Sequence, residues 1–439
     1  MLEKLNSAYL LFQRSLKQRL SSSLGQNTAW ALAGYGLRLL IQAIYFVIIA
    51  RYLGPKQYGG FVAVTALASV VSPFVGVGSG NLLVKHVARN RAMFSECWGN
   101  GLLLTFLSGI LLAAITAGFS LSLLPPSIAL TTVVLVCVSD LLFVKFLDMA
   151  AWAFQSFEML SQYAQLNVLI SLMRLAGIVG LAVLAPRPTI VAWSAVYLAG
   201  SFLAALIGVA WATASFGMPT LELGRVRAEI VEGFHFSVSL SAQTIYNDID
   251  KTMVARLSTL QAAGIYAAAY RLIDVTFIPV RALLNAAYPV FFRHGTTGFH
   301  ASLRFGRRLL LQTIAYPLFA FVALLAGASF VPFILGRGYS EVTEALRWLS
   351  LLPLLKTLHY FVADSLTGAG FQRLRTIIQV GIAAFNFTIN LWLIPSFGWR
   401  GAAWASIASD GLLAAGLWCA ATVLILRQSR ALQATEELV

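Results

Sequence analysis

The sequence predicts an all-α polytopic membrane protein: about twelve transmembrane helices in two pseudo-twofold-related six-helix lobes around a central cavity. Of its 439 residues, 59% are hydrophobic and only 11% are charged, whereas soluble domains carry about 25% charged residues. The apolar residues form long runs, such as Leu102–Leu124 and Leu309–Leu335, and a helix needs about 20 of them to cross the hydrocarbon layer. These runs lack the period of two that barrel strands require, so helices remain the way to satisfy the backbone in lipid.

Apolar runs and turn residues divide the chain into an N-terminal lobe (29–215), a linker (216–233), a C-terminal lobe (234–426) and a tail (427–439). The predicted spans are 29–50, 58–80, 98–122, 128–152, 165–185 and 190–215, then 234–256, 262–291, 307–333, 341–366, 374–395 and 400–426. Turn-forming pairs mark several breaks between spans, namely Gly54-Pro55, Pro125-Pro126, Pro186 with Pro188, and Pro395 with Gly398.

Residues 1–28 precede the first span and show a helical pattern of their own. Leu2, Leu5, Tyr9, Phe12 and Leu16 recur at helical spacing, which predicts an amphipathic helix on the cytoplasmic membrane surface. The basic residues are spread along this segment without a short apolar core and a small-residue cleavage site, so a cleaved signal peptide is not predicted.

The Lys and Arg residues predict the orientation of the chain. Seventeen of the 31 fall in segments on one side of the predicted topology, six on the other side and eight within spans. Because cytoplasmic loops carry the excess of basic residues, both termini are predicted in the cytoplasm. The first outer loop, with Arg51 and Lys56, is the one exception. The net charge of +14 is spread over short loops, so no nucleic-acid partner is predicted.

Two stretches 205 residues apart are alike. Ala50-Arg51 through Gly59 and Phe61 corresponds to Ala255-Arg256 through Gly264 and Tyr266, at the join between the first two spans of each half. Two halves with the same orientation imply a pseudo-twofold axis along the membrane normal. Such a pair of lobes facing a cavity is the geometry of an alternating-access transporter.

Eight basic residues fall inside predicted spans, where each costs about 2.5–3.5 kcal/mol if it faces lipid. They are Arg38, Lys145, Arg174, Lys251, Arg271, Arg281, Arg347 and Lys356. Four have an acid three residues away, which predicts pairing within the helix as one alternative: Lys145 with Asp148, Lys251 with Asp248, Arg271 with Asp274, and Arg347 with Glu344. Arg38, Arg174 and Lys356 have no such acid and are the stronger candidates for a wet cavity.

The eighth span carries a stripe of charge. Arg271, Asp274 and Arg281 fall within about 80° of one another on a regular helix, unless Pro279 kinks it. Guanidinium groups bind phosphate oxygens in bidentate fashion, so the cavity is predicted to suit an anion.

Acids also fall inside spans, and four are candidates for coupling or pairing: Asp250, Asp274, Asp364 and Asp410. Asp364 and Asp410 have no nearby cation in the sequence. Each is predicted to form a helix-to-helix salt bridge or, alternatively, to bind a coupling proton or Na⁺.

Motifs for catalysis, metals and cofactors are missing from the sequence. It has no GxxxxGK[ST] nucleotide loop, no HExxH and no CxxC, and its three cysteines are far apart. We therefore expect no catalytic residue, no metal site and no cofactor.

Several segments resemble one known family. The run ARYLGPKQYGGF at residues 50–61 closely resembles the R-x-LGP-x-x-YG-x-F signature of bacterial polysaccharide-repeat flippases, in the multidrug/oligosaccharidyl-lipid/polysaccharide exporter superfamily. In the second half, Asp250-Lys251 followed by GIYAAAY at residues 264–270 resembles that family's D-K and G-x-Y-x-A-A-Y segments. LIP at 393–395 with Gly398 and GAA at 401–403 is similar to a further motif. The second lobe departs from the pattern, because its copy reads Leu257-Ser258-Thr259-Leu260 and lacks the Gly-Pro turn.

The resemblance implies movement of an undecaprenyl-pyrophosphate-linked oligosaccharide from the cytoplasmic to the periplasmic leaflet of the inner membrane by alternating access, without enzymatic chemistry. The polymer made would be O-antigen (in lipopolysaccharide), capsule or exopolysaccharide, with a polysaccharide polymerase and chain-length proteins as further partners beside membrane lipid. The expected substrate-binding residues are Arg38, Arg174, Arg271, Arg281, Lys356 and Lys145. A cation-coupled multidrug exporter of the same superfamily and a membrane-embedded polysaccharide polymerase are the alternatives.

Overall fold

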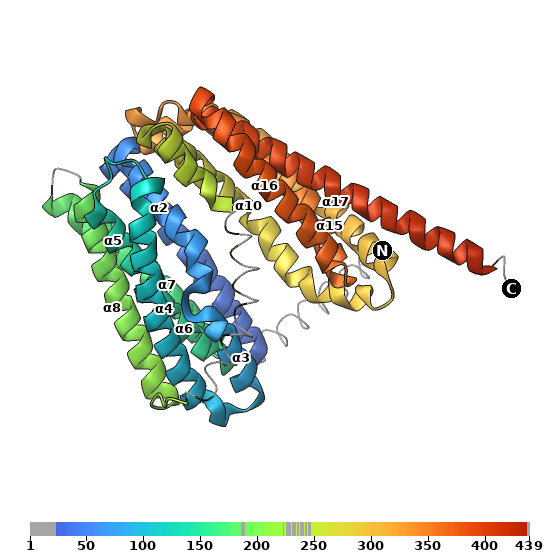
Figure 1. Ribbon diagram of the computed structural model, residues 1–439, viewed down its shortest axis with the longest axis horizontal. Helices are drawn as coiled ribbons and strands as arrows, with labels where there is room; N and C mark the ends of the chain where they lie inside the picture. Colours follow the sequence, from blue (N-terminus) through green and yellow to red (C-terminus); the bar gives the residue numbers. More distant parts are fainter. Residues whose placement is uncertain are drawn as a thin grey trace, which may run out of the picture. The chain divides into compact units, whose positions relative to one another are not determined.

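The computed structural model describes residues 23–185, 189–222 and 247–436, with six single residues from 224 to 244 between them. All regular elements in this part of the chain are helices (Figure 1), so the predicted all-α class is confirmed. Nine of the described helical segments are long and apolar enough to cross a membrane. The chain is therefore a multi-pass membrane protein. Residues 1–22 of the predicted segment 1–28 and half of the predicted linker 216–233 lie outside the described residues.

Tertiary contacts divide the chain into two compact units. The N unit comprises residues 1–53 and 64–244, and the C unit comprises residues 54–63 and 245–439. Residues 54–63 therefore belong to the C unit although N-unit segments precede and follow them in the chain.

The first described helix, α2 (Ser23–Val71), contains the first predicted span and most of the second. The predicted break at Gly54-Pro55 is present, but it is a kink inside one helix and not a loop. Gly54 has φ 67° and ψ 169°, a conformation that a residue without Cβ adopts at little cost. Pro55 then restarts the helix, because its missing N–H would have no partner in a first turn.

The rest of the N unit is a set of closely packed helices. They are η1 (Ser72–Gly78), α3 (Ser79–Arg89), η2 (Arg91–Met93), α4 (Phe94–Leu123), α5 (Leu130–Val138), the π-turn η3 (Ser139–Phe143), α6 (Val144–Ser156), α7 (Leu160–Leu184) and α8 (Ile190–Phe216). As predicted, α4 ends before Pro125-Pro126. Thr189 caps α8 by accepting a hydrogen bond from the backbone N of Ala192, at 3.2 Å.

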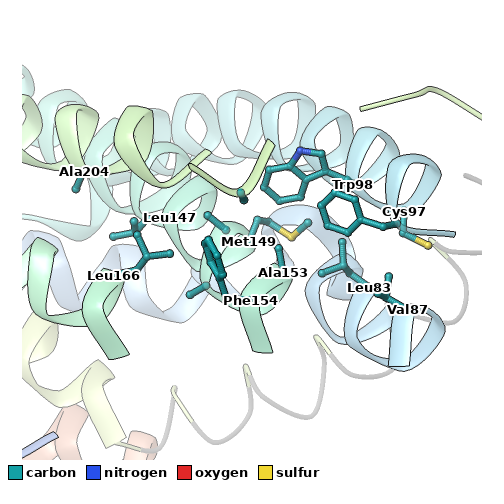
Figure 2. Packing of buried hydrophobic residues seen from close by; sticks show 14 of the residues in the cluster. Leu83, Val87, Cys97, Trp98, Leu147, Met149, Ala153, Phe154, Leu166 and Ala204 are labelled. Atoms are coloured by element: carbon teal, nitrogen blue, oxygen red, sulfur yellow. The ribbon is translucent and has the colours of Figure 1, made fainter. Parts of the chain in front are cut away.

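A buried apolar cluster holds these helices together (Figure 2). Trp98 of α4, Phe154 of α6 and Leu166 of α7 lie in it, each no more than 1% exposed. Trp98 also donates its indole N–H to the Thr213 hydroxyl on α8, at 3.1 Å. In lipid, helices associate through such packing and hydrogen bonds and not through exclusion of water.

The C unit follows the same principle with more interrupted helices. A helix through residues 247–257 precedes α10 (Leu260–Gly295), α11 (Phe299–Thr313), α12 (Ala315–Gly327), η4 (Ala328–Phe330), α13 (Val331–Leu335), η5 (Arg337–Tyr339), α14 (Val342–Leu349), α15 (Leu352–Gly368), α16 (Gln372–Phe397) and α17 (Trp399–Glu436). Figure 1 shows α16 and α17 side by side. The predicted span 307–333 is divided among α11, α12 and α13, and the predicted tail begins as a continuation of α17.

Candidate functional site

The N unit contains three of the predicted substrate-binding cations, and each contacts a polar partner. Lys145 lies 3.5 Å from the Asp148 carboxylate one turn away on α6, as its spacing predicts. Arg38 on α2 donates to the side-chain oxygen of Asn167 on α7, at 2.9 Å.

Arg174, the third cation, belongs to a network of three helices. Its guanidinium on α7 donates to the Tyr197 hydroxyl on α8 at 2.6 Å, and that hydroxyl donates to the Asp140 carboxylate at 2.7 Å. Arg174 and Asp140 are themselves 3.7 Å apart. The acid that balances Arg174 therefore comes from another helix, so helical spacing alone does not reveal it.

Asp140 lies in the π-turn η3, between α5 and α6. The turn is tied to α8 because the Ser139 hydroxyl donates to the Ser201 hydroxyl at 2.8 Å. Single π-turns are rare and occur often at functional positions. Nothing in the sequence marks this one.

In the C unit, two lysines lie against the same aromatic ring. The Lys251 ammonium is 4.8 Å from the Tyr270 ring centroid and the Lys356 ammonium is 5.1 Å from it. Both lysines are buried. Lys251 also contacts the Asp248 carboxylate at 2.5 Å, as its spacing predicts. Within the described part of the chain, Lys356 makes no ion pair.

Asp250 is fully engaged beside these lysines. One carboxylate oxygen accepts the backbone N–H of Lys251 at 2.8 Å, and the other accepts the Tyr266 hydroxyl at 2.5 Å. Tyr266 also shares a hydrogen bond of 2.9 Å with the Ser406 hydroxyl on α17. The arrangement joins the helix at 247–257 to α10 and α17.

The predicted charged stripe lies on α10, which continues as one helix through Pro279. Arg271 and Asp274 are partly buried, and Arg281 is exposed. The Arg281 guanidinium lies 5.7 Å from the Phe277 ring centroid, while the charge of Asp274 acts on Lys251. Pairing of Arg271 with Asp274 stays a prediction.

Asp364 and Asp410 each have a basic partner on a neighbouring helix. Asp364 on α15 lies 3.2 Å from Arg375 on α16, and Arg375 also donates to the Thr367 hydroxyl at 2.7 Å. Asp410 on α17 lies 3.4 Å from Nε2 of His359 on α15.

The predicted pair of Arg347 with Glu344 is wrong. Glu344 instead accepts two hydrogen bonds from the Arg400 guanidinium, at 2.8 and 2.6 Å, and Arg347 donates to the Ser329 hydroxyl at 3.1 Å. The planar guanidinium of Arg400 satisfies both carboxylate oxygens at once, a geometry that a neighbour on the same helix does not offer.

Sequence reasoning missed the aromatic members of the site. Tyr266 and Tyr270 are the two tyrosines of the GIYAAAY motif, so that motif held a usable signal. No such signal pointed to Tyr197 or His359. Among the described residues, no three His, Cys, Asp or Glu side chains group as metal ligands.

Among the solved structures that share this fold are membrane transporters and a flippase. An inward-facing multidrug resistance MATE family transporter of the MOP superfamily has a TM-score of 0.71 at 12% identity, covering 91% of this chain and 99% of that one. The lipid II flippase MurJ, in an inward closed conformation, has a TM-score of 0.72 at 13% identity, covering 90% and 87%. A MOP superfamily transporter from Pyrococcus furiosus, described as having a binding pocket of reverse polarity, has a TM-score of 0.57 at 15% identity, covering 93% and 97%.

No curated protein matches the chain in sequence. A family match does exist, to the family described as polysaccharide biosynthesis protein, over residues 24–294. This match includes both copies of the repeat and confirms the resemblance drawn from the motifs. Because it covers more than half of the sequence, the chain belongs to the polysaccharide biosynthesis protein family.

Proposed function

We propose that this protein is a flippase that moves undecaprenyl-pyrophosphate-linked oligosaccharide repeat units from the cytoplasmic to the periplasmic leaflet by alternating access. The proposal places it in the bacterial inner membrane with both termini in the cytoplasm. It works in cell-surface polysaccharide synthesis beside a polysaccharide polymerase and chain-length proteins, and it carries out no enzymatic step.

One observation carries the proposal: the buried ammonium group of Lys356. This residue of α15 is 5% exposed, and its ammonium group lies 5.1 Å from the centroid of the Tyr270 ring. A buried cation without an acidic partner is costly at bilayer depth. An anionic substrate group supplies the missing charge.

A diphosphate is the group that fits this requirement. It cannot cross hydrocarbon unaided, since removal of its water costs tens of kcal/mol in the Born limit. Lys356, with Lys251 beside the same ring, replaces part of that water, and Arg271 and Arg281 of α10 offer bidentate contacts. The polyprenyl tail stays in the lipid throughout.

The three basic residues of the N unit enter the proposal differently. Arg38, Arg174 and Lys145 already contact Asn167, Asp140 and Asp148. We propose that these three residues bind substrate only when the substrate replaces those contacts. Lys356 is therefore the first residue to test.

The test uses the full chain in proteoliposomes with a fluorescent polyprenyl-diphosphate oligosaccharide. The rate at which sugar becomes accessible to an added lectin measures transfer between leaflets. Lys356→Gln should lower this rate about tenfold or more, since a hydrogen bond to a charged group contributes about 1.5–3 kcal/mol. Lys85→Gln, a change at an exposed lysine of α3, is the matched control.

Two outcomes contradict the proposal. Transfer at the wild-type rate by Lys356→Gln removes this lysine from the mechanism. Transport of cationic drugs, with no transfer of the lipid-linked sugar, favours the multidrug exporter. In cells, loss of the protein should trap finished lipid-linked repeat units on the cytoplasmic face, whereas loss of a polymerase leaves them outside.

A further inference from the structure

The buried imidazole of His359 lies in the middle of α15, away from any solvent-exposed surface of the C unit. Its side chain is 3% exposed, and the Asp410 side chain opposite it on α17 is 2% exposed. Nε2 lies 3.4 Å from the nearer Asp410 oxygen. Neither ring nitrogen makes a hydrogen bond within the described part of the chain. Buried polar atoms are nearly always hydrogen-bonded, so this imidazole needs an explanation.

Charged and titratable groups approach the pair from α15 and α10. Lys356 lies one turn before His359 on the same face of α15, over the Tyr270 ring. The charge of Asp410 acts on the hydroxyls of Tyr266 and Tyr270, both on α10.

The other helices around the pair contribute neutral groups or residues already engaged. Asp250 and Lys251 are held by Tyr266 and Asp248. On α16, the buried Asn386 is uncharged and donates to the Ser409 hydroxyl at 2.9 Å. On α11 the basic residues Arg304, Arg307 and Arg308 are exposed, and on α14 Glu344 is held by Arg400 at the start of α17.

A single added proton turns the contact between Nε2 and Asp410 into a charge-assisted hydrogen bond. Without it, the Asp410 carboxylate faces a neutral imidazole at 3.4 Å, and neither nitrogen of that buried ring makes a hydrogen bond. With it, an imidazolium donates to the carboxylate and the pair is neutral as a whole. We propose that His359 and Asp410 together form a proton-binding site that joins α15 to α17.

The site gives the two helices two states. The proton comes from water and returns to water, and no bond other than N–H or O–H forms or breaks. When it is bound, an ion pair holds α15 against α17. After its release the contact weakens, and the charge of Asp410, no longer balanced by the imidazolium, acts on the hydroxyl of Tyr270, whose ring lies beside Lys356. This part of the inference rests on the proposed function: proton release in one leaflet orientation and uptake in the other would drive the transport cycle.

Proton binding is measured directly on the purified full chain in detergent, without any transport. A pH-indicator dye counts the protons that the protein takes up as the pH is lowered stepwise over the range in which the protein stays folded. Wild type should take up about one proton more than His359→Gln and one more than Asp410→Asn. The double variant should lose no more than either single variant, since the two residues share one site.

Matched variants separate the site from damage to the fold. Asp410→Glu keeps a carboxylate and should keep the proton. Ser409→Ala, one residue earlier on α17, removes a buried hydroxyl without a titratable group and should leave the count unchanged. Equal uptake by wild type and both single variants overturns the inference, as does a double variant that loses two protons.

Transport then tests the coupling. In proteoliposomes, a pH gradient across the membrane should accelerate transfer of the lipid-linked sugar by wild type but not by His359→Gln. A response of the variant equal to that of wild type overturns the coupling role. Failure of the proposed function would give a different result. The wild-type protein would then transfer no lipid-linked sugar, whereas its proton uptake in detergent would still exceed that of His359→Gln.

Discussion

Gly59 and Gly264 occupy equivalent positions in the two copies of the repeat, and each lies against the backbone of the other copy. A Cβ atom built on Gly59 would collide with the carbonyl oxygen of Leu260, and one built on Gly264 would collide with the carbonyl oxygen of Pro55. Leu260 and Pro55 are separated by the same 205 residues as the two glycines. The contact is therefore self-complementary, like an isologous interface between two subunits. It explains why both copies keep a glycine here.

Gly59→Ala and Gly264→Ala should destabilise the protein by similar amounts. The added methyl group meets rigid backbone in both cases, and overpacking costs about 1–3 kcal/mol. Thermal unfolding of the purified chain in detergent measures the loss. Gly180→Ala on α7, where nothing lies within 4 Å of the added atom, is the control and should not be destabilised. An unchanged unfolding temperature for Gly59→Ala contradicts the reciprocal contact.

Asp140→Asn should be among the most destabilising changes in the N unit. It leaves the Arg174 guanidinium, whose side chain is 25% exposed, without its balancing charge, and removal of one partner costs up to about 3–5 kcal/mol where a pair is fully buried. Adding Arg174→Gln should recover part of that loss. Asp148→Asn, whose carboxylate side chain is 38% exposed, should cost less than about 1 kcal/mol. Equal unfolding temperatures for Asp140→Asn and Asp148→Asn would contradict the network.

Tyr270→Phe and Tyr270→Leu should differ in stability. The phenyl ring retains the attraction for the Lys251 and Lys356 ammonium groups, whereas leucine removes it, and each desolvated contact contributes up to about 2 kcal/mol. We expect unfolding of Tyr270→Phe near the wild-type temperature and a clear drop for Tyr270→Leu. If both variants unfold alike, the ring serves only as packing.

Two ion pairs of the C unit should differ in strength. Asp364 with Arg375 is largely buried, at 9% and 18% exposure, while both members of Glu344 with Arg400 are 45% exposed. Double-mutant cycles on thermal unfolding should give a coupling energy below about 1 kcal/mol for the exposed pair and a larger one for Asp364 with Arg375. A larger coupling for Glu344 with Arg400 contradicts this ranking.

Local rules predicted the features that depend on neighbouring residues. Apolar runs predicted the helices because length and hydropathy suffice for a span. The pairs of Lys145 with Asp148 and Lys251 with Asp248 followed from helical spacing alone. The break at Gly54 was predicted at the correct position, but it was expected to be a loop and is a kink inside α2. A Gly-Pro pair marks where a helix is interrupted without showing how many residues the interruption includes.

Features that depend on packing between helices were missed. Arg174 pairs with Asp140, and Glu344 pairs with Arg400 instead of Arg347. In both cases the partner lies on another helix, so its spacing in the sequence does not identify it. The π-turn at Ser139–Phe143 contains no residue type, such as Gly or Pro, that would indicate it in the sequence. His359 is buried whereas His86, His294 and His300 are partly or fully exposed, and burial is a property of the folded chain.

The placement of residues 54–63 has a consequence for biogenesis. They are synthesised about 200 residues before Leu260 and Gly264, against which they pack, a delay of about 10–40 s at typical translation rates of about 5–20 residues per second. During that interval the helix around Gly59 lacks the backbone of Leu260 and Gly264 against which it packs. A chain cleaved between residues 244 and 245 would leave residues 54–63 on the N-terminal fragment, although they pack within the C unit. The C-terminal fragment would therefore lack part of its structure until it bound the N-terminal fragment.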